Sequence, residues 1–402
     1  MFSFFAIFFV LYIAANLYLL IRAREALTAW FPQINRQIFG LAFWLLAIVF
    51  PLGHQFEEGL SYTAANLVSL VGYTWLAVIF YGFFIALAFD VIKLIDRFIG
   101  FLPTRLKEPR VAGILAAVVL VAILAGGTWN ASSPKLTRYT VDVNRAAGGA
   151  RQLHIVMVSD LHLGAVVNNG RLSEMVRRIN AQKPDLVVIP GDLMDENAVV
   201  FEKQQMAKTL RGIRSKYGVY ASLGNHDDNR EGGSYDKKLA DAGIVLLKDR
   251  SIQLGRSFYL AGRAMQNNHD FNPEKAVPLR QVLGVRQPDL PVILLDHAPT
   301  RFAESAAAGV DLLLSGHTHR GQIWPINYLT ERMYVTDYGM YSKGGFHAIV
   351  SDGFGTWGPP LRIGNRPEIV DITVHFAPRQ AAPKAGGSDS HRLSSQSPAA
   401  AP

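Results

Sequence analysis

Residues 154–162 read HIVMVSDLH, and this stretch carries the pattern that decides the fold of the second half of the chain. An apolar run bounded by polar residues, here residues 154–159, is typical of a buried strand. Asp160 and His162 follow it two positions apart, so in extended backbone both side chains face the same side. Two metal-competent side chains at the end of a buried strand predict a ligand site at a sheet edge.

The same arrangement recurs four times further along the chain. The later pieces are GDLMD (191–195), GNHD (224–227), Asp296-His297 and GHTH (316–319). Each follows an apolar run, and open α/β sheets bind ligands at the carboxyl ends of their strands. A single piece of this kind is more often a capped turn or a polar pair. Five pieces in order predict that two Asp, one Asn and four His converge on one edge.

Short apolar runs and helical patterns alternate beyond residue 150, which predicts an α/β or α+β domain. The expected strands are 154–159, 186–189, 218–223, 258–261, 292–295, 311–314, 333–336, 347–350 and 368–376. The expected helices are 171–181, 203–217 and 237–242. Because no helix is expected between the last three strands, we predict a mixed architecture.

In this order the motifs D-x-H, G-D-x-x-D, G-N-H-D, H and G-H-x-H resemble those of the calcineurin-like metallophosphoesterases, over about residues 152 to 376. His297-Ala-Pro, GHTHRGQIWP (316–325) and PEIVDITV (367–374) are similar to the membrane-associated or exported bacterial branch of that family. The resemblance implies two facing mixed β-sheets flanked by helices, with a binuclear metal centre at their edge.

The resemblance also implies which residues bind the two metal ions. One ion would be held by Asp160, His162, Asp192 and His319, and the second by Asp192, Asn225, His297 and His317. In this scheme Asp192 bridges the two ions. Oxygen and nitrogen ligands of this kind suit divalent manganese, zinc or iron.

Catalytic roles follow from the same resemblance. His226 would protonate the leaving oxygen, and Asp195 would orient it; an imidazole suits this role because its ordinary pKa lies near 6.5. The chain departs from the family after Asp195, where Glu196 and Asn197 stand. It departs again at Arg320, which we expect to have a surface or packing role rather than to clamp phosphate.

The predicted chemistry is hydrolysis of a phosphomonoester or phosphodiester by a metal-dependent enzyme. Two ions about 3.5–4 Å apart bind a shared water, lower its pKa and position it for in-line attack on phosphorus. No protein nucleophile is then needed. This agrees with a chain that has no cysteine and no Gly-x-Ser-x-Gly motif.

Before residue 130 the sequence predicts an all-α, multi-span membrane region. Four stretches are apolar enough to cross a bilayer, namely 2–21, 38–53, 63–89 and 111–129. The second is short and contains Pro51, so a kinked or re-entrant segment is an alternative there. We expect a connector over 131–151, the catalytic domain over 152–377 and a disordered tail over 378–402.

Basic residues predict the orientation of these helices, because cytoplasmic loops are enriched in lysine and arginine. The connections after the first and the third predicted helix are basic. Their lysine and arginine residues are Arg22, Arg24, Arg36, Lys93, Arg97, Arg105, Lys107 and Arg110. The second connection instead contains Glu57 and Glu58. With four helices, both the N-terminus and the catalytic domain would lie outside the cytoplasm, on a bacterial inner membrane.

Confinement to a membrane favours a phospholipid or lipid-linked phosphate as the substrate. Hydrolysis of soluble extracytoplasmic nucleotides or phosphodiesters is the alternative within the same enzyme class. A membrane scaffold or channel with a metal-binding domain is an alternative of another class, although the helices contain hardly any ionisable residue. Nucleic acid is not an expected partner, because residues 150–378 have no basic stripe interleaved with aromatics despite the net charge of +8.

Overall fold

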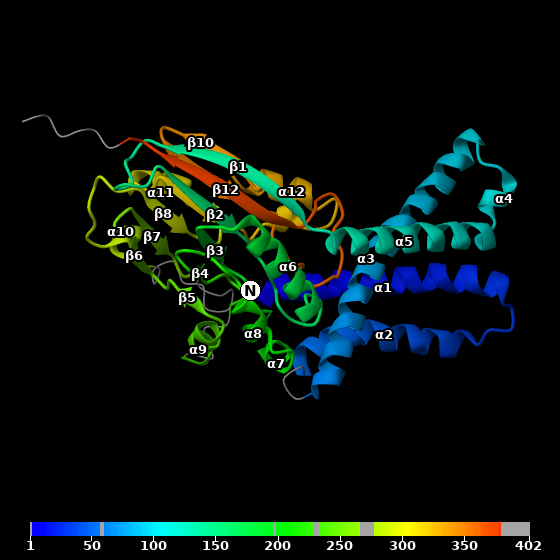
Figure 1. The fold of residues 1–402 in the computed structure, drawn as a ribbon. Coiled ribbons are helices and arrows are strands. Elements are labelled where there is room, and N and C mark those ends of the chain that lie inside the picture. Colours follow the sequence, from blue (N-terminus) through cyan, green and yellow to red (C-terminus); the bar gives the residue numbers. More distant parts are fainter. Residues whose placement is uncertain (1, 57–59, 196–197, 228–232, 266–276, 379–402) are drawn as a thin grey trace, which may run out of the picture.

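The computed structural model describes residues 2–56, 60–195, 198–227, 233–265 and 277–378. It has two parts, a group of long helices and a sandwich of two β-sheets (Figure 1). Except for Pro378, the expected tail over 378–402 lies outside the described residues. His269, which the sequence places in a polar stretch, also lies outside them.

The helical part contains four long apolar helices and one short helix. They are α1 (Phe2–Trp30), α2 (Arg36–Phe56), α3 (Tyr62–Ile99), α4 (Thr104–Lys107) and α5 (Pro109–Ala131). Three stretches are long and apolar enough to cross a membrane, namely Ala6–Trp30, Tyr62–Ile99 and Pro109–Ala131. The stretch Arg36–Leu52 is apolar but shorter, and Pro51 lies inside its helix. Each of the four predicted spans lies within one of these helices.

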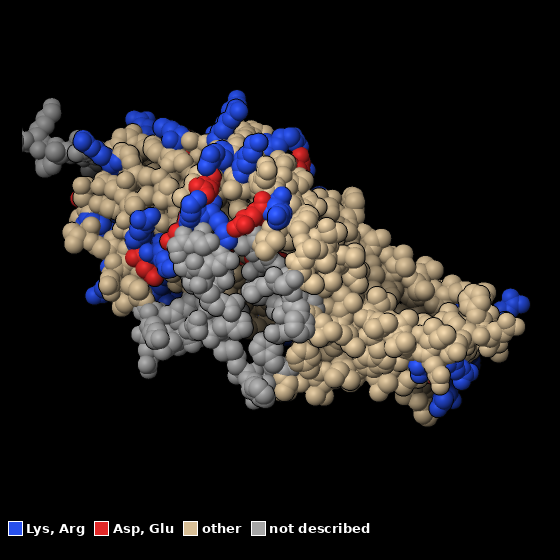
Figure 2. Space-filling view, turned by 90° about the horizontal axis from the view of Figure 1, so that it is seen from below, with Lys and Arg blue, Asp and Glu red and all other residues tan. Residues whose placement is uncertain are grey.

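The basic residues of the helical part gather at its tip, away from the sandwich, which has basic residues of its own (Figure 2). There Trp30 Nε1 donates to the carbonyl oxygen of Arg110 at 3.3 Å, which joins the end of α1 to the start of α5. Helix α3 runs ten residues beyond the predicted end at residue 89, so Lys93 and Arg97 belong to a helix and not to a loop. Gly100 ends it in the left-handed conformation, with φ 68°.

The sandwich consists of two six-stranded sheets. In the first, the order is β1 (Lys135–Val143), β12 (Glu368–Phe376), β2 (Gln152–Met157), β3 (Leu186–Pro190), β4 (Val219–Ser222) and β5 (Ile244–Leu246). In the second, the order is β10 (Gly339–Lys343), β11 (Phe346–Val350), β9 (Leu312–Ser315), β8 (Val292–Leu295), β7 (Phe258–Gly262) and β6 (Arg250–Leu254). Strands β2 to β5 are parallel, as are β7, β8, β9 and β11, while the remaining pairs include antiparallel ones. The prediction of two facing mixed sheets is confirmed.

Helices cover both outer faces of the sandwich. The first sheet packs against α6 (Asn169–Gln182), α8 (Met206–Leu210) and α9 (Gly233–Asp241), and the second against α10 (Leu279–Leu283) and α11 (Phe302–Ala307). Successive side chains of a strand face opposite sides. In β2, Val156 therefore packs under the helices, whereas Ile155 and Met157 pack in the core between the sheets. This alternation fixes the register and so the position of the residues that follow each strand.

Two predicted elements differ from the structure, and the short strands β5, β6 and β10 were not predicted. The predicted strand 333–336 is wrong, because α12 (Asn327–Met333) ends there and the next strand begins at Gly339. The predicted helix 203–217 is too long. Instead α7 (Ala198–Lys203) and α8 are separate short helices, and the chain turns at Gly212, after α8 has ended at Leu210. Strand β1 was not predicted at all. It pairs with β12 over nine residues within the expected connector, and its outer side chains are partly exposed, so its apolar pattern is weak.

Candidate metal centre

Metal-competent side chains follow β2, β3, β4, β8 and β9, the neighbouring strands at the middle of the two sheets. Because these strands run parallel within each sheet, their carboxyl ends meet at one edge of the sandwich. The seven residues predicted as metal ligands all lie there. The contacts among them form two overlapping groups.

The first group consists of Asp160, His162 and His319, all of which are buried. One ligand atom from each lies within 4.8 Å of the others. His319 Nε2 is 3.1 Å from His162 Nε2 and 3.6 Å from Asp160 Oδ1. Three ligands of this kind at such distances can surround one divalent cation.

The second group consists of Asp160, Asp192 and His297, again all buried. His297 Nε2 is 3.0 Å from Asp192 Oδ2 and 3.9 Å from Asp160 Oδ1. Asp192 Oδ2 is also 3.7 Å from Nε2 of His162, a member of the first group. Both carboxylates therefore lie between the two groups, whereas the family resemblance assigned that position to Asp192 alone.

Asn225 and His317 border the second group. His317 Nδ1 is 2.8 Å from Asn225 Oδ1, and the ring of His317 is 5.1 Å from that of His297. The backbone N–H of His317 donates to Asp160 Oδ1 at 2.8 Å. The structure thus brings all the predicted ligands together, with Asn225 and His317 at the side of the centre.

The backbone at this edge adopts positive φ angles at several residues other than glycine. Five of the predicted ligands have positive φ, namely Asp160 (51°), His162 (44°), Asp192 (52°), His317 (73°) and His319 (46°). Such conformations are costly for residues with a side chain, and they cluster at functional sites. The strands also approach closely, because a Cβ on Gly224 would lie 2.1 Å from Asp192 Oδ1 and a Cβ on Gly316 would lie 2.2 Å from Asp160 Oδ2.

Burial sets the charge of the histidines. It lowers the pKa of His162 to about 3 and that of His317 to about 4, and it holds the pKa of His319 well below its usual range. His297 behaves differently. Burial acts to lower its pKa, but the carboxylates of Asp192 and Asp160 outweigh this and raise the pKa to about 10. Neutral imidazoles beside carboxylates are what a divalent cation needs, and at His297 a cation would replace the proton.

Two buried polar atoms of the first group have no hydrogen-bonding partner in the described ranges of the chain. They are Oδ2 of Asp160 and Nδ1 of His162. An unsatisfied buried carboxylate oxygen is costly unless a cation or a donor meets it. The residues present therefore fit a divalent metal ion on the chemistry of the ligands as well as on their spacing.

Asp227 organises two of the ligand loops, a role that the sequence did not reveal. Its buried carboxylate accepts hydrogen bonds from the backbone N–H groups of Asp192 and Leu193 at 2.9 Å each and of Gly224 at 2.7 Å. The hydroxyl of Tyr235 donates to it as well. Asp227 thus fixes the loop of Asp192 against the loop that carries Asn225. Its place in the GNHD motif was the only signal for this.

His226 lies at the rim of the centre. Its ring is 5.1 Å from that of His162 and 5.7 Å from that of Trp357, which is 55% exposed. The backbone N–H of His226 donates to Asp192 Oδ1 at 2.9 Å. Asp195 Oδ1 lies 4.0 Å from His162 Nδ1, so this carboxylate faces the histidine against which His226 packs. His226 is thereby placed between the buried ligands and solvent.

Arg362 contacts the centre from a loop that the sequence did not single out. Its guanidinium is fully buried, and Nη2 lies 3.1 Å from Nδ1 of His319. The same guanidinium donates to the carbonyl oxygen of Gly355 at 2.7 Å and to Asn365 Oδ1 at 3.1 Å. Asn365 in turn donates to the carbonyl oxygen of His319 at 3.0 Å. Arg362 and Asn365 thus fix both the ring and the backbone of a predicted ligand.

The loop of Arg362 is attached to helix α5. Asn130 Nδ2 donates to the carbonyl oxygens of Arg362 at 3.0 Å and Asn365 at 2.7 Å. The backbone N–H of Arg362 donates to the carbonyl oxygen of Gly127 at 3.0 Å. The end of a long apolar helix is therefore connected to His319 through two residues.

Replacing Asn130 with alanine should weaken metal binding, because Arg362 and Asn365 lose their support from α5. Loss of an outer partner of a metal ligand typically costs about 10–100-fold in affinity. The metal dissociation constant of the purified full chain measures this. Tyr62→Phe is the matched control, because it removes a hydrogen bond of 3.1 Å to Gln204 at the same boundary without touching this loop. Equal losses in both variants would contradict the connection.

Arg320 and His154 take structural positions. The guanidinium of Arg320 stacks 4.9 Å from the ring centroid of Tyr338, which agrees with the packing role expected for it. His154 Nε2 lies 2.6 Å from Asp371 Oδ1 in the first sheet.

Comparisons with known proteins agree with this geometry. The family model described as "Calcineurin-like phosphoesterase" matches residues 153–321. An uncharacterized metallophosphoesterase of Aquifex aeolicus is 31% identical over 60% of this chain and 91% of its own length. A protein of Bos taurus named "Transmembrane protein with metallophosphoesterase domain" is 30% identical over 66% of this chain, and the chain spans 62% of its length. A protein of the same name from Danio rerio is 27% identical over 78% of this chain and 75% of its own.

Proposed function

The chain belongs to the calcineurin-like metallophosphoesterase family, and on this premise we propose that it hydrolyses phosphoesters with two divalent metal ions. The observation that carries the proposal is the pair of overlapping buried ligand groups. The groups share Asp160, and Asp192 of the second group lies close to His162 of the first. Bound ions of this kind activate water and neutralise phosphoryl charge. Manganese, zinc and iron all suit the oxygen and nitrogen ligands.

The protein's own residues then have distinct tasks. Asp160, His162, Asp192, Asn225, His297, His317 and His319 hold the ions. His226, which lies on the solvent side of His162, protonates the oxygen of the leaving group. Asp195 orients His226, and its position 4.0 Å from His162 supports a place in this part of the site.

We further propose that residues 1–130 anchor the enzyme in a membrane and that residues 152–377 form its catalytic domain. Three helices have the length and apolarity of membrane spans. The start of α1 and the end of α5 lie near the sandwich, whereas the connections between α1 and α2 and between α3 and α5 lie at the far tip (Figure 1). The basic residues of that tip favour the cytoplasmic side of a bacterial inner membrane, with the catalytic domain outside.

Fusing a reporter of topology after residue 135 tests this orientation. Alkaline phosphatase, which is active only outside the cytoplasm, should be active there, and a fluorescent protein that folds only in the cytoplasm should stay dark. A fusion after Lys107, at the far tip, should give the opposite pair of results. Cytoplasmic activity after residue 135 would overturn the proposed orientation.

A phospholipid or a lipid-linked phosphate is the substrate class that we favour, because the anchor confines the enzyme and such a substrate to the same surface. The full chain should therefore release product from phospholipid vesicles faster than from soluble nucleotides or aryl phosphodiesters. A preference for the soluble compounds would instead support hydrolysis of extracytoplasmic nucleotides or phosphodiesters.

Metal dependence is the decisive test of the activity itself. After treatment with a chelator, the purified full chain should lose hydrolysis of phosphomonoesters, phosphodiesters and phospholipids alike. Adding Mn²⁺, Zn²⁺ or Fe²⁺ in excess of the chelator should restore it with at least one of these metals. Absence of turnover with every metal and substrate class would favour a scaffold or channel with a metal-binding domain.

A further inference from the structure

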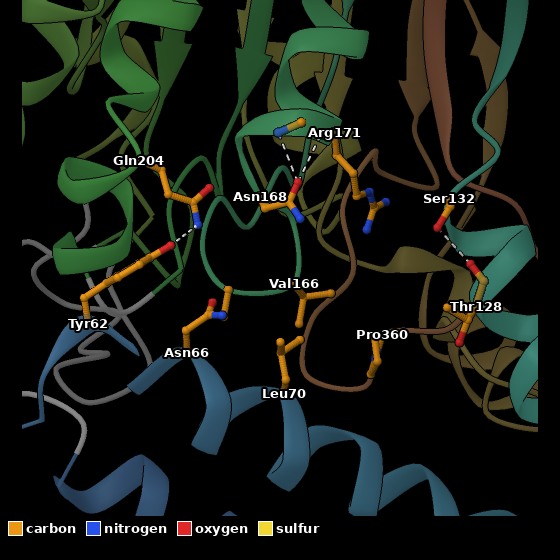
Figure 3. A pocket seen from close by; sticks show the side chains of 12 residues that line it. Tyr62, Asn66, Leu70, Thr128, Ser132, Val166, Asn168, Arg171, Gln204 and Pro360 are labelled. Atoms are coloured by element: carbon orange, nitrogen blue, oxygen red, sulfur yellow. Dashed lines mark hydrogen bonds between the residues drawn. The ribbon is translucent and has the colours of Figure 1, made fainter. Parts of the chain in front are cut away.

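A cavity of about 680 Å³ lies between the helical part and the sandwich, separate from the metal ligands. Figure 3 shows that α3 forms its floor and that the segment leading into α6 forms its roof. Residues 165–171, which follow the ligand His162, line one side, and Pro360 lines another. The cavity thus touches loops that also border the metal centre.

Among the described residues that line the cavity, Arg171 is the only charged one. Its side chain reaches from α6 toward the space above Asn66 and Leu70 of α3 (Figure 3). Nη2 donates to the carbonyl oxygen of Ala131 at 2.7 Å, and the guanidinium lies 5.9 Å from the ring centroid of Phe354. Within the part of the chain that the structure describes, no carboxylate lies within 4.0 Å of this guanidinium.

Arg171 nevertheless stays charged at neutral pH. Burial, and to a smaller extent the nearby Arg362, lower its pKa to about 10, which is still well above neutrality. A half-buried guanidinium without a counter-charge is costly, and its planar donors match phosphate oxygens. The cavity therefore has the electrostatics of an anion site.

The remaining lining is polar but uncharged. Oδ1 of Asn66 is buried and finds no hydrogen-bonding partner among the described residues, so it can accept a bond from a ligand. Gln204 and Tyr62 already bond to each other at 3.1 Å. A ligand that fits combines a phosphate for Arg171 with an O–H or N–H donor for Asn66.

The surroundings of the cavity are those of a membrane surface. Its floor is the first part of α3, and Thr128 at its side belongs to α5; both helices have the composition of membrane spans. Large apolar side chains beside it face outward, with Leu67 61% exposed and Trp129 73% exposed. Tryptophan is enriched at membrane–water boundaries, where headgroups lie.

From these observations we infer that the cavity binds the phosphate headgroup of a membrane lipid, with Arg171 as the anion partner and Asn66 as the acceptor for a headgroup hydroxyl or ammonium. The acyl chains would lie along the apolar surfaces of α3 and α5. This binding requires neither the metal ions nor turnover, so it stands apart from the proposed hydrolysis.

Native mass spectrometry of the purified full chain, in detergent micelles that contain a chelator, tests the inference. Phosphatidylglycerol is the probe. Phosphatidylcholine is the comparison, because its headgroup has no O–H or N–H donor. One phosphatidylglycerol should bind tightly, and Arg171→Ala should weaken that binding about tenfold or more, as expected for a charge-assisted contact. Arg177→Ala is the matched control, because Arg177 is exposed on the same helix and pairs with Glu174 at 2.6 Å.

A second variant separates lipid binding from folding, because Arg171→Ala also loses the bond to Ala131. Asn66→Asp keeps that bond and nearly the same shape but places a carboxylate in the cavity, so it should also weaken phosphatidylglycerol binding. Wild-type binding in both variants would overturn the inference. Displacement of the lipid by an equal concentration of glycerol phosphate would show that the site binds soluble phosphates and would overturn the lipid assignment.

Discussion

Replacing Asp192 with asparagine should remove metal from both halves of the centre and lower phosphoester hydrolysis by about 10²-fold or more. Its carboxylate lies 3.0 Å from His297 Nε2 and 3.7 Å from His162 Nε2, so one side chain serves both ligand groups. Removing a side chain that only supports a metal ligand typically lowers affinity or activity about 10–100-fold. Removing a ligand that two ions share should lower them further.

The electrostatics of the site support the same expectation. Burial acts against the charge of Asp192, but His297, His226 and His162 outweigh it and hold the pKa of the carboxyl well below its usual range. Asp192 is thus a fixed negative charge at the centre, which asparagine cannot supply. The change should leave the fold intact, because Asp227 accepts its hydrogen bond from the backbone N–H of residue 192, which asparagine keeps.

Metal content per chain, measured by elemental analysis together with activity, checks this prediction. Asp371→Asn is the matched control, since Asp371 is a partly buried carboxylate that pairs with His154 in the first sheet, away from the ligands. The control should keep two equivalents of metal and full activity. Retention of one full equivalent by Asp192→Asn would show that this carboxylate serves a single ion.

The convergence of the seven candidate ligands could be predicted from sequence because each piece is local. A strand end, a glycine and a charged residue within a few positions specify both the turn and the direction of the side chain, as in GDLMD and GHTH. Parallel strands then bring such pieces to one edge without any further information. The predicted strands that precede the motifs accordingly agree with the structure to within two residues at each end.

Residues that act through the tertiary structure could not be found in the same way. Arg362 contacts His319 across 43 positions of sequence, and Asn130 reaches Arg362 across 232. Neither residue belongs to a motif of recognisable chemistry, and an arginine in a loop usually lies in solvent. Strand β1 escaped prediction for a related reason, because its register depends on β12, which lies more than 200 residues further along the chain.

The contacts of Asn130 and Arg362 also change the view of the helical part. If the helices were only an anchor, a chain beginning near residue 135 would suffice for activity. In the structure the last turn of α5 supports the loop that fixes His319. Truncation at residue 135 would remove Asn130 and leave that loop without its attachment, so we expect the isolated domain to bind metal more weakly than the full chain.

Replacing His226 with alanine should lower hydrolysis by about 10²-fold or more while metal content stays nearly unchanged. His226 is not a member of either ligand group, and its backbone N–H donates to Asp192, a bond that alanine keeps. Its ring instead lies between His162 and the exposed Trp357, where a substrate would enter. Loss of the imidazole therefore removes a proton donor and leaves the ions in place.

The nature of the leaving group distinguishes this role from a structural one. A substrate with a poor leaving group, such as an alkyl phosphodiester, needs protonation of the departing oxygen, so its turnover should fall by the full factor in His226→Ala. A nitrophenyl ester leaves readily without a proton and should lose much less. His347→Ala, on the second sheet where the imidazole bonds to Ser342, serves as the control and should change neither rate. Equal losses for both substrates, or loss of metal in parallel with activity, would show that His226 supports the metal centre and does not transfer a proton.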